Sequence, residues 1–221
     1  MAKVLSLVGD FPNPWKRKIQ DEIKQIGTGR WSPTVDDFYA NAGSGAITCS
    51  SFRELLAAIY DNPQGSLAQV NVLTHGSRSS IAFKGTVHAR TGIVTLKHAT
   101  ALNDTVLQSA ETLEFKFVNK RTRRTVKFTL TDVKTRFAKN AKIVFYACNS
   151  GTDLLLLQNV ANTFNVPALG FSKELVYCPS FKTRPPKIDR RWIDVGSCTS
   201  PKRKLSLLNP DRQTKPKKAN P

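Results

Sequence analysis

Two residues of this chain, His75 and Cys148, are of the right types to form a catalytic pair. Each follows an apolar run that predicts a β-strand, residues 67–74 before the histidine and residues 141–147 before the cysteine. Catalysis by a cysteine requires a thiolate, a nearby imidazole to take or share its proton, and hydrogen-bond donors for the developing oxyanion. The pair therefore predicts nucleophilic chemistry by the Cys148 thiolate.

Two neighbouring features favour this chemistry. A free cysteine has a pKa of about 8.5, so little of it is thiolate at neutral pH. A predicted helix over residues 152–164 begins just after Cys148, and the N-terminus of a helix stabilises negative charge. Gly76 has no side chain to shield its amide, so we expect the amides of Gly76 and Cys148 to form the oxyanion hole.

The elements that must position the pair alternate between strands and helices. Strands are predicted at residues 3–8, 67–74, 141–147 and 168–171, and helices at residues 15–26, 52–60, 101–112 and 152–164. Two hairpins are predicted, from residues 81–87 with 93–98 and from residues 113–118 with 125–130, and residues 28–48 read as loop. This order predicts an α/β fold with a mainly parallel central sheet and helices on both faces.

In an open parallel sheet, ligands bind at the rim formed by the carboxyl ends of the strands. If the strands before His75 and Cys148 are parallel neighbours, both side chains reach this rim. We therefore expect the imidazole and the thiol to face one another there.

The two motifs together resemble the signature of the clan CD cysteine peptidases. That signature is an apolar strand ending in His-Gly and a second one ending in Ala-Cys; the counterparts here are Val-Asn-Val-Leu-Thr-His-Gly at residues 70–76 and Ile-Val-Phe-Tyr-Ala-Cys-Asn at residues 143–149. The clan includes caspases, metacaspases, legumain, gingipains, separase, the self-cleaving domains of bacterial toxins and the CHAT domains. Residues 67–178 are most similar to bacterial CHAT-like and related caspase-like domains.

This resemblance implies a caspase-like three-layer sandwich with an extra β-hairpin, and the activity of a cysteine endopeptidase on protein substrates. It implies His75 as the base, Cys148 as the nucleophile, and Gly76 with Cys148 as the oxyanion donors. The sequence around the nucleophile is Tyr-Ala-Cys-Asn-Ser, whereas caspases proper carry Gln-Ala-Cys-Arg-Gly. The resemblance therefore does not imply the preference of caspases for an aspartate before the scissile bond.

In the clan, the segment after the helix that follows the nucleophile helps to build the pocket for the residue before the scissile bond. The resemblance implies pocket residues at Gly170, Phe171, Ser172 and Lys173. Lys173 would favour an acidic substrate residue, although a solvated loop lysine is the commoner role for such a position.

The other cysteines and histidines do not indicate a metal site. The chain has four cysteines and three histidines, without a CxxC motif, whereas a structural zinc site usually shows ligands two to four residues apart. We expect no metal or other cofactor, and we expect the remaining cysteines to be small buried hydrophobes in a reducing compartment.

The net charge of +18 indicates a surface that attracts polyanions such as nucleic acid, acidic lipids or inositol phosphates. Residues 1–195 are predicted to form the peptidase domain, and residues 196–221 a basic, disordered tail. The basic tip at residues 119–124 is open to three interpretations: a phosphate-binding tip, an activation loop, or a solvated hairpin end. The related toxin domains are activated by inositol hexakisphosphate, so an inositol phosphate is a candidate activator by analogy.

The chain contains no run near the ~20 apolar residues of a membrane span, and no secretory signal is recognisable. We expect a cytoplasmic protein, or an effector or toxin delivered into a target-cell cytoplasm by a route without a classical signal peptide. Two other function classes stay open. One is a catalytically inactive caspase-like binding module, and the other is a basic protein that binds nucleic acid through its charge.

Overall fold

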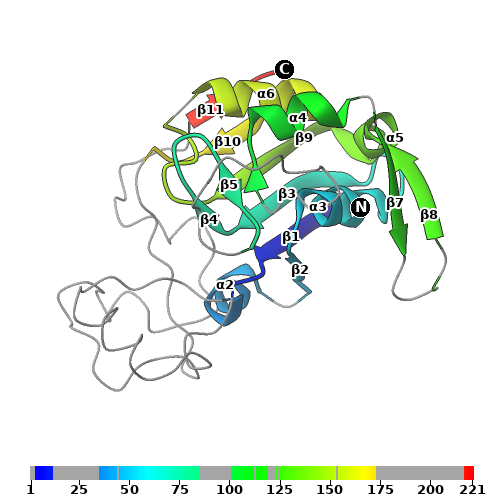
Figure 1. The fold of residues 1–221 in the computed structure, drawn as a ribbon, viewed down its shortest axis with the longest axis horizontal. Helices are drawn as coiled ribbons and strands as arrows, with labels where there is room; N and C mark the ends of the chain where they lie inside the picture. Colours follow the sequence, from blue (N-terminus) through cyan, green and yellow to red (C-terminus); the bar gives the residue numbers. More distant parts are fainter. Residues whose placement is uncertain are drawn as a thin grey trace.

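The computed structural model describes residues 3–11, 35–43, 45–84, 101–111, 113–118, 123, 125–152, 154–172 and 217–221. Their centre is a six-stranded sheet in the order β2-β1-β3-β9-β10-β11 (Figure 1). Its strands are β1 (Lys3–Gly9), β2 (Ile47–Cys49), β3 (Leu67–Leu73), β9 (Phe137–Tyr146), β10 (Ala168–Gly170) and β11 (Lys217–Ala219). All neighbouring strands are parallel except β10 and β11, which confirms the predicted mainly parallel sheet.

Two small antiparallel sheets accompany the central one. The first contains β4 (His75–Gly76), β5 (Ile81–Ala82) and β6 (Ala101–Leu102), so the chain folds back directly after β3. The second is the predicted hairpin of β7 (Glu114–Val118) and β8 (Thr125–Thr129). The other hairpin was predicted from residues 81–87 with 93–98, and its residues beyond Lys84 lie outside the described part of the chain.

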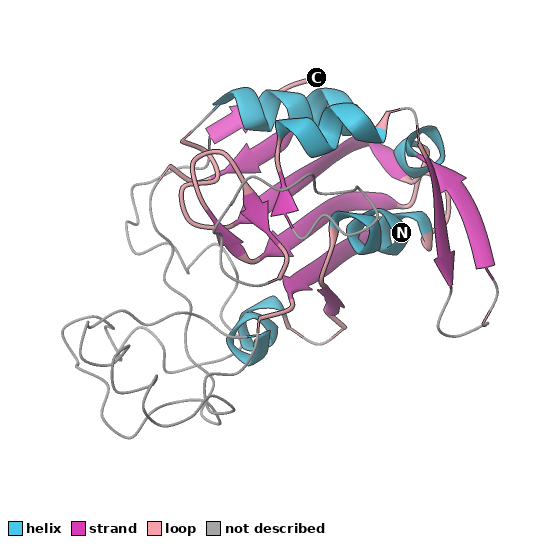
Figure 2. Ribbon diagram, viewed as in Figure 1, coloured by secondary structure: helices cyan, strands magenta, loops and turns pink. Residues whose placement is uncertain are grey.

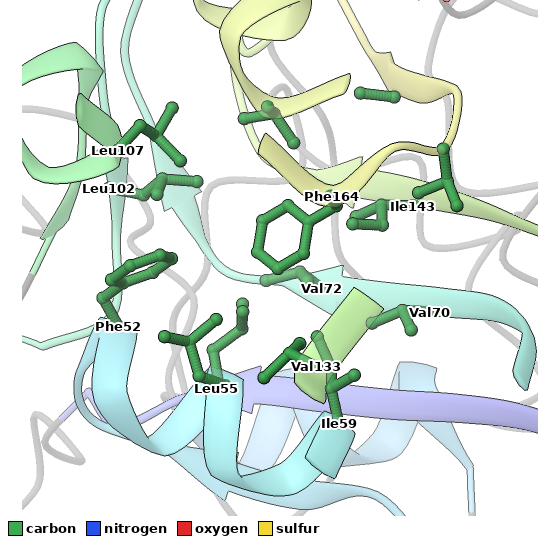
Figure 3. Close-up of a cluster of buried hydrophobic side chains, with 14 of the residues drawn as sticks. Phe52, Leu55, Ile59, Val70, Val72, Leu102, Leu107, Val133, Ile143 and Phe164 are labelled. Carbon is green, nitrogen blue, oxygen red and sulfur yellow. The ribbon is translucent and has the colours of Figure 1, made fainter. Parts of the chain in front are cut away.

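One face of the central sheet carries the larger core. The helices on this face are α3 (Phe52–Tyr60), α4 (Asp104–Ala110), α5 (Leu130–Lys134) and α6 (Leu154–Phe164). Figure 3 shows how their apolar side chains meet those of the strands: Phe164 of α6 lies next to Val72 of β3, and Phe52 and Leu55 of α3 belong to the same cluster. The Ser51 hydroxyl, accepting from the Glu54 amide at 3.3 Å, caps α3 at its predicted start.

The opposite face carries a smaller core near the carboxyl ends of the strands. The helix α2 (Val35–Ala42) lies against β1, apart from the other described helices (Figure 2). Its Phe38 is fully buried in a cluster that also contains Val8, Phe11, Leu73, Ala82, Val144 and Phe171. We call these seven side chains the rim cluster.

Two parts of the prediction are corrected by the structure. Residues 28–48 were expected to be loop, but they include α2 and the first residues of β2. Val35, Phe38, Tyr39 and Ala42 repeat with helical spacing and pack on the rim cluster, a periodicity obscured by the surrounding polar residues. The helix predicted at residues 101–112 begins only at Asp104, because Asn103 caps it by accepting from the Val106 amide at 2.9 Å.

The predicted disorder of residues 196–221 does not hold for the last residues of the chain. Lys217–Ala219 form β11, which pairs with β10 at the edge of the central sheet. Ala219 is buried in the larger core, and the Gln158 amide donates to the Asn220 carbonyl at 2.5 Å. Residues 196–216 lie outside the described part, as does the predicted helix at residues 15–26.

Candidate active site

The strands that precede His75 and Cys148 are parallel neighbours in the sheet. Leu73 of β3 lies in register with Tyr146 of β9, and the Thr74 amide extends this ladder by donating to the Tyr146 carbonyl at 3.1 Å. His75 and Cys148 each stand two positions beyond the Leu73–Tyr146 pair. Two segments that are more than 70 residues apart in sequence therefore leave the sheet side by side at its carboxyl rim.

Gly76 brings the backbones of these two segments into contact. A Cβ atom placed on Gly76 would lie 2.7 Å from the carbonyl oxygen of Cys148 and 2.8 Å from the Cβ atom of Ala147. Real Cβ atoms do not approach other atoms this closely, so position 76 accepts only glycine without a shift of the backbone. Gly76 and Cys148, the two predicted oxyanion donors, are thus direct neighbours in space.

The His75 ring packs against two phenylalanine rings, Phe11 and Phe38, which also contact one another and which the sequence analysis did not single out. Its centroid lies 4.4 Å from that of Phe11, with an interplanar angle of 87°, and 5.4 Å from that of Phe38, with an angle of 75°. Both arrangements are edge-to-face, the geometry that aromatic rings prefer. We call these two residues the aromatic clamp.

Cys148 packs against the same cluster that contains the aromatic clamp. Its side chain is half-buried, is not in a disulfide, and contacts the rim cluster. The imidazole and the thiol therefore belong to one face of the sheet, at one end of its strands. Among the residues that the structure describes, no group of three or more potential ligands could hold a metal ion.

Cys49 shows how a purely structural cysteine differs from Cys148. It is buried in the larger core, and its thiol donates to the Ser51 carbonyl at 3.2 Å. Burial, which disfavours the charged thiolate, strongly raises the pKa of Cys49. Cys49 is consequently an unreactive internal reference for the more exposed Cys148.

The loop after Cys148 is fixed by a buried serine. The Ser150 hydroxyl donates to the Ala147 carbonyl at 2.7 Å and accepts from the Phe171 amide at 3.2 Å. The Gly151 amide donates to the Phe171 carbonyl at 2.8 Å. These bonds tie the cysteine loop to the end of β10, and Asn149 adopts a left-handed φ of 57° to make the turn.

The expected support from the helix N-terminus is weaker than predicted. The helix α6 begins at Leu154, so five residues separate it from Cys148. The influence of a helix terminus falls off within about one turn. The amides of Ser150, Gly151 and Thr152 also donate to carbonyl groups of the protein.

The predicted pocket residues lie beside the cysteine loop. Gly170 is in such close contact with Ser150 that a Cβ atom on it would lie 2.8 Å from the Ser150 carbonyl oxygen. Phe171 is buried in the rim cluster, and the Ser172 carbonyl accepts from the Thr152 hydroxyl at 3.2 Å. In this arrangement Gly170 and Phe171 support the cysteine loop, and their part in a substrate pocket stays a prediction. Lys173 lies outside the described residues.

Sequence reasoning missed the aromatic clamp and Ser150. Phe11 follows β1 just as His75 follows β3, so the strand-end argument applied to His75 could also have found Phe11. Phe38 was assigned to a loop, and its helical spacing was the available signal. Ser150 carries no sequence signal for a buried role, because its partner Phe171, just after β10, is distant in sequence.

Comparison with known proteins adds no further assignment. No protein-family model, curated protein or solved structure matches this chain. None of the helices in the described ranges is long and apolar enough to cross a membrane. Any assignment of function must therefore come from the structure itself.

Proposed function

We propose that this protein is a cysteine endopeptidase with a caspase-like, three-layer fold, in which Cys148 is the nucleophile and His75 the base. One observation carries the proposal: the His-Gly and Ala-Cys motifs end two adjacent parallel strands, and Gly76 lies against the Cys148 carbonyl. The side chains of His75 and Cys148 are both half-buried against the rim cluster, which also supports the proposal. A cysteine that served only for packing would be expected to resemble Cys49.

The proposed reaction begins with transfer of the thiol proton from Cys148 to His75. The thiolate then attacks the scissile carbonyl carbon, and the amides of Gly76 and Cys148 donate to the resulting oxyanion. Collapse of this intermediate breaks the C–N bond, and His75 returns the proton to the departing amine. Water, activated by His75, hydrolyses the remaining thioester and releases the second product.

Substrate cleavage by the Cys148→Ala variant provides the direct test. With a mixed peptide library, the wild-type chain should cleave and Cys148→Ala should not, while Cys49→Ala should retain cleavage. Equal thermal unfolding of wild type and Cys148→Ala would show that the loss is chemical. Full cleavage by Cys148→Ala would overturn the assignment of the nucleophile.

Alkylation separates the peptidase from its main alternative, an inactive caspase-like binding module. Iodoacetamide labelling of each cysteine, followed against pH by mass spectrometry of peptides, reports thiolate formation residue by residue. In a peptidase, the labelling midpoint of Cys148 should lie well below the value of about 8.5 for free cysteine. A midpoint at the free value, together with no cleavage, would instead favour the inactive module.

A further inference from the structure

The β7–β8 hairpin and the strand β4, which contains His75, lie on opposite sides of the described part of the protein (Figure 1). It leads through α5 into β9, and the Leu67 amide at the start of β3 donates to the Arg136 carbonyl at 3.0 Å. The hairpin is therefore attached where β3 and β9 begin, whereas His75 and Cys148 lie where these strands end.

One face of the hairpin is anchored to the protein by stacked aromatic rings. Phe115 stacks on Phe128 with centroids 5.7 Å apart, and Phe128 stacks on Tyr60 of α3 at 4.7 Å. The Arg136 guanidinium covers the other end of the stack, 4.3 Å from the Tyr60 centroid. This stack holds the two strands firmly to the protein.

The other face of the hairpin is exposed and basic. Lys116 and Lys127 lie directly opposite one another across the two strands, and both are exposed. Glu114 offsets only part of the positive charge of the two lysines, through a 3.4 Å ion pair with Lys127. In the described part of the hairpin, Lys116, Arg123 and Lys127 are basic and Glu114 is the one acidic residue.

This arrangement costs stability unless a negative partner covers it. Like charges directly opposite in a β-ladder destabilise the strands. Arg123, at the tip, is exposed and has a φ of 55°, a conformation that is unfavourable for a residue with a side chain. A bound polyanion would neutralise the repulsion and stabilise this surface.

We propose that the β7–β8 hairpin binds the phosphate backbone of duplex DNA, without dependence on sequence. Two strands about 4.8 Å apart form a ribbon that fits a major groove about 12 Å wide. The lysines and Arg123 then meet phosphates on its two sides, and the exposed Thr125 can donate to a phosphate oxygen. The proposal does not depend on the peptidase activity.

The distribution of apolar groups favours a duplex over other polyanions. Single-stranded nucleic acid is usually held by exposed aromatic rings, but Phe115 and Phe128 of the hairpin are buried and Phe117 packs, partly buried, against the larger core. A membrane surface calls for exposed apolar side chains beside the basic ones, and Val118 is the one large apolar side chain that the described part of the hairpin exposes.

Fluorescence anisotropy with a labelled DNA duplex of about 20 base pairs, two helical turns, tests the proposal. The full chain should bind this duplex more tightly than the same single strand, and binding should weaken steeply with salt. The double variant Lys116→Gln/Lys127→Gln should bind about tenfold more weakly at moderate salt, and its slope of log K against log salt should be shallower by about 1.8. The matched control, Lys217→Gln/Lys218→Gln on β11, removes two exposed lysines from another edge and should change the slope far less.

The unfolding midpoint distinguishes a loss of binding from a loss of fold. Because the repulsion between Lys116 and Lys127 disappears in the double variant, its midpoint should not fall below that of the wild type. Arg123→Gln, which leaves the ladder intact, should weaken binding in the same direction.

Two results would overturn the proposal. The first is an equal loss of affinity in the hairpin variant and in the β11 control, since binding would then follow total charge alone. The second is tighter binding to the single strand, or to vesicles containing phosphatidylserine, than to the duplex. Cys148→Ala should bind the duplex like wild type, so failure of the peptidase proposal would leave this result unchanged.

Discussion

Gly76 lies against the backbone of Cys148 so closely that residue 76 has no room for a Cβ atom, which would stand 2.7 Å from the Cys148 carbonyl oxygen. The contact joins the segment after β3 to the segment after β9, which are the two parts of the candidate site. The atom nearest to such a Cβ is a backbone carbonyl oxygen, which cannot turn aside as a flexible side chain could. A substitution at position 76 can be accommodated only if the two segments separate.

Gly76→Ala should consequently lower both stability and activity. We expect a destabilisation of about 1–3 kcal/mol, as for other overpacked sites, measured by urea unfolding. Peptide cleavage should fall much more than the unfolded fraction explains, because the oxyanion donors move apart. Ser79→Ala, at an exposed position of the following turn, is the control and should change stability by less than about 0.5 kcal/mol. Wild-type stability in Gly76→Ala would show that the close contact is absent in solution.

The aromatic clamp predicts a specific spectroscopic change in Phe11→Leu. The Phe11 ring lies edge-to-face with His75 at 4.4 Å, so its ring current should shift the imidazole protons of His75. Only three histidines are present, so these NMR signals are readily assigned. In Phe11→Leu the shift should largely disappear, and kcat should fall more than KM rises, because the imidazole is less well oriented.

Phe52→Leu provides the matched control for the aromatic clamp. Phe52 is fully buried, but it belongs to the larger core on the other face of the sheet. Both variants should lose roughly 1–2 kcal/mol of stability through the smaller side chain. Only Phe11→Leu should alter the His75 signals, and an equal effect of both variants would mean that Phe11 acts on stability alone.

The end of the chain should be required for full stability, because β11 completes the sheet. Ala219→Asp places a carboxylate at a buried position opposite Ala168 and should cost about 1–3 kcal/mol in urea unfolding. Asn220→Asp adds the same charge at the next, exposed residue and should be close to neutral. Similar stability of both variants would show that β11 does not pack in solution. Deletion of the predicted tail, residues 196–221, would remove β11 together with the positive charge. Such a deletion therefore cannot test the role of the charge by itself.

Asp132 should contribute to the acid sensitivity of the fold. Hydrogen bonds from the Thr129 amide and hydroxyl lower the pKa of the Asp132 carboxyl below its ordinary value of 3.8. A depressed folded-state pKa stabilises the protein above the unfolded-state pKa, and this stabilisation is lost as the pH falls through the folded-state value. Asp132→Asn should therefore be less stable than wild type at pH 7, and the difference should shrink below about pH 4. A difference that stays constant between pH 7 and pH 3 would contradict this role of the Thr129–Asp132 hydrogen bonds.

Local sequence determined most of the elements near the candidate site. The apolar runs before His75 and Cys148 predicted β3 and the second half of β9, and Ser51 marked the start of α3. The hairpin of β7 and β8 followed from alternation of apolar and polar residues. These features depend on side-chain periodicity and caps within a few residues, so they can be read from the chain alone.

Tertiary structure decided which of these elements meet. The aromatic clamp combines Phe11 after β1 with Phe38 of α2, and Ser150 is fixed by Phe171 at the end of β10. The strand β11 has one apolar residue in its Lys-Lys-Ala sequence and forms only because β10 offers an unpaired edge and the core accepts Ala219. Such contacts join residues that are distant in sequence, and their energy comes from burial and ladder hydrogen bonds that a local pattern does not encode.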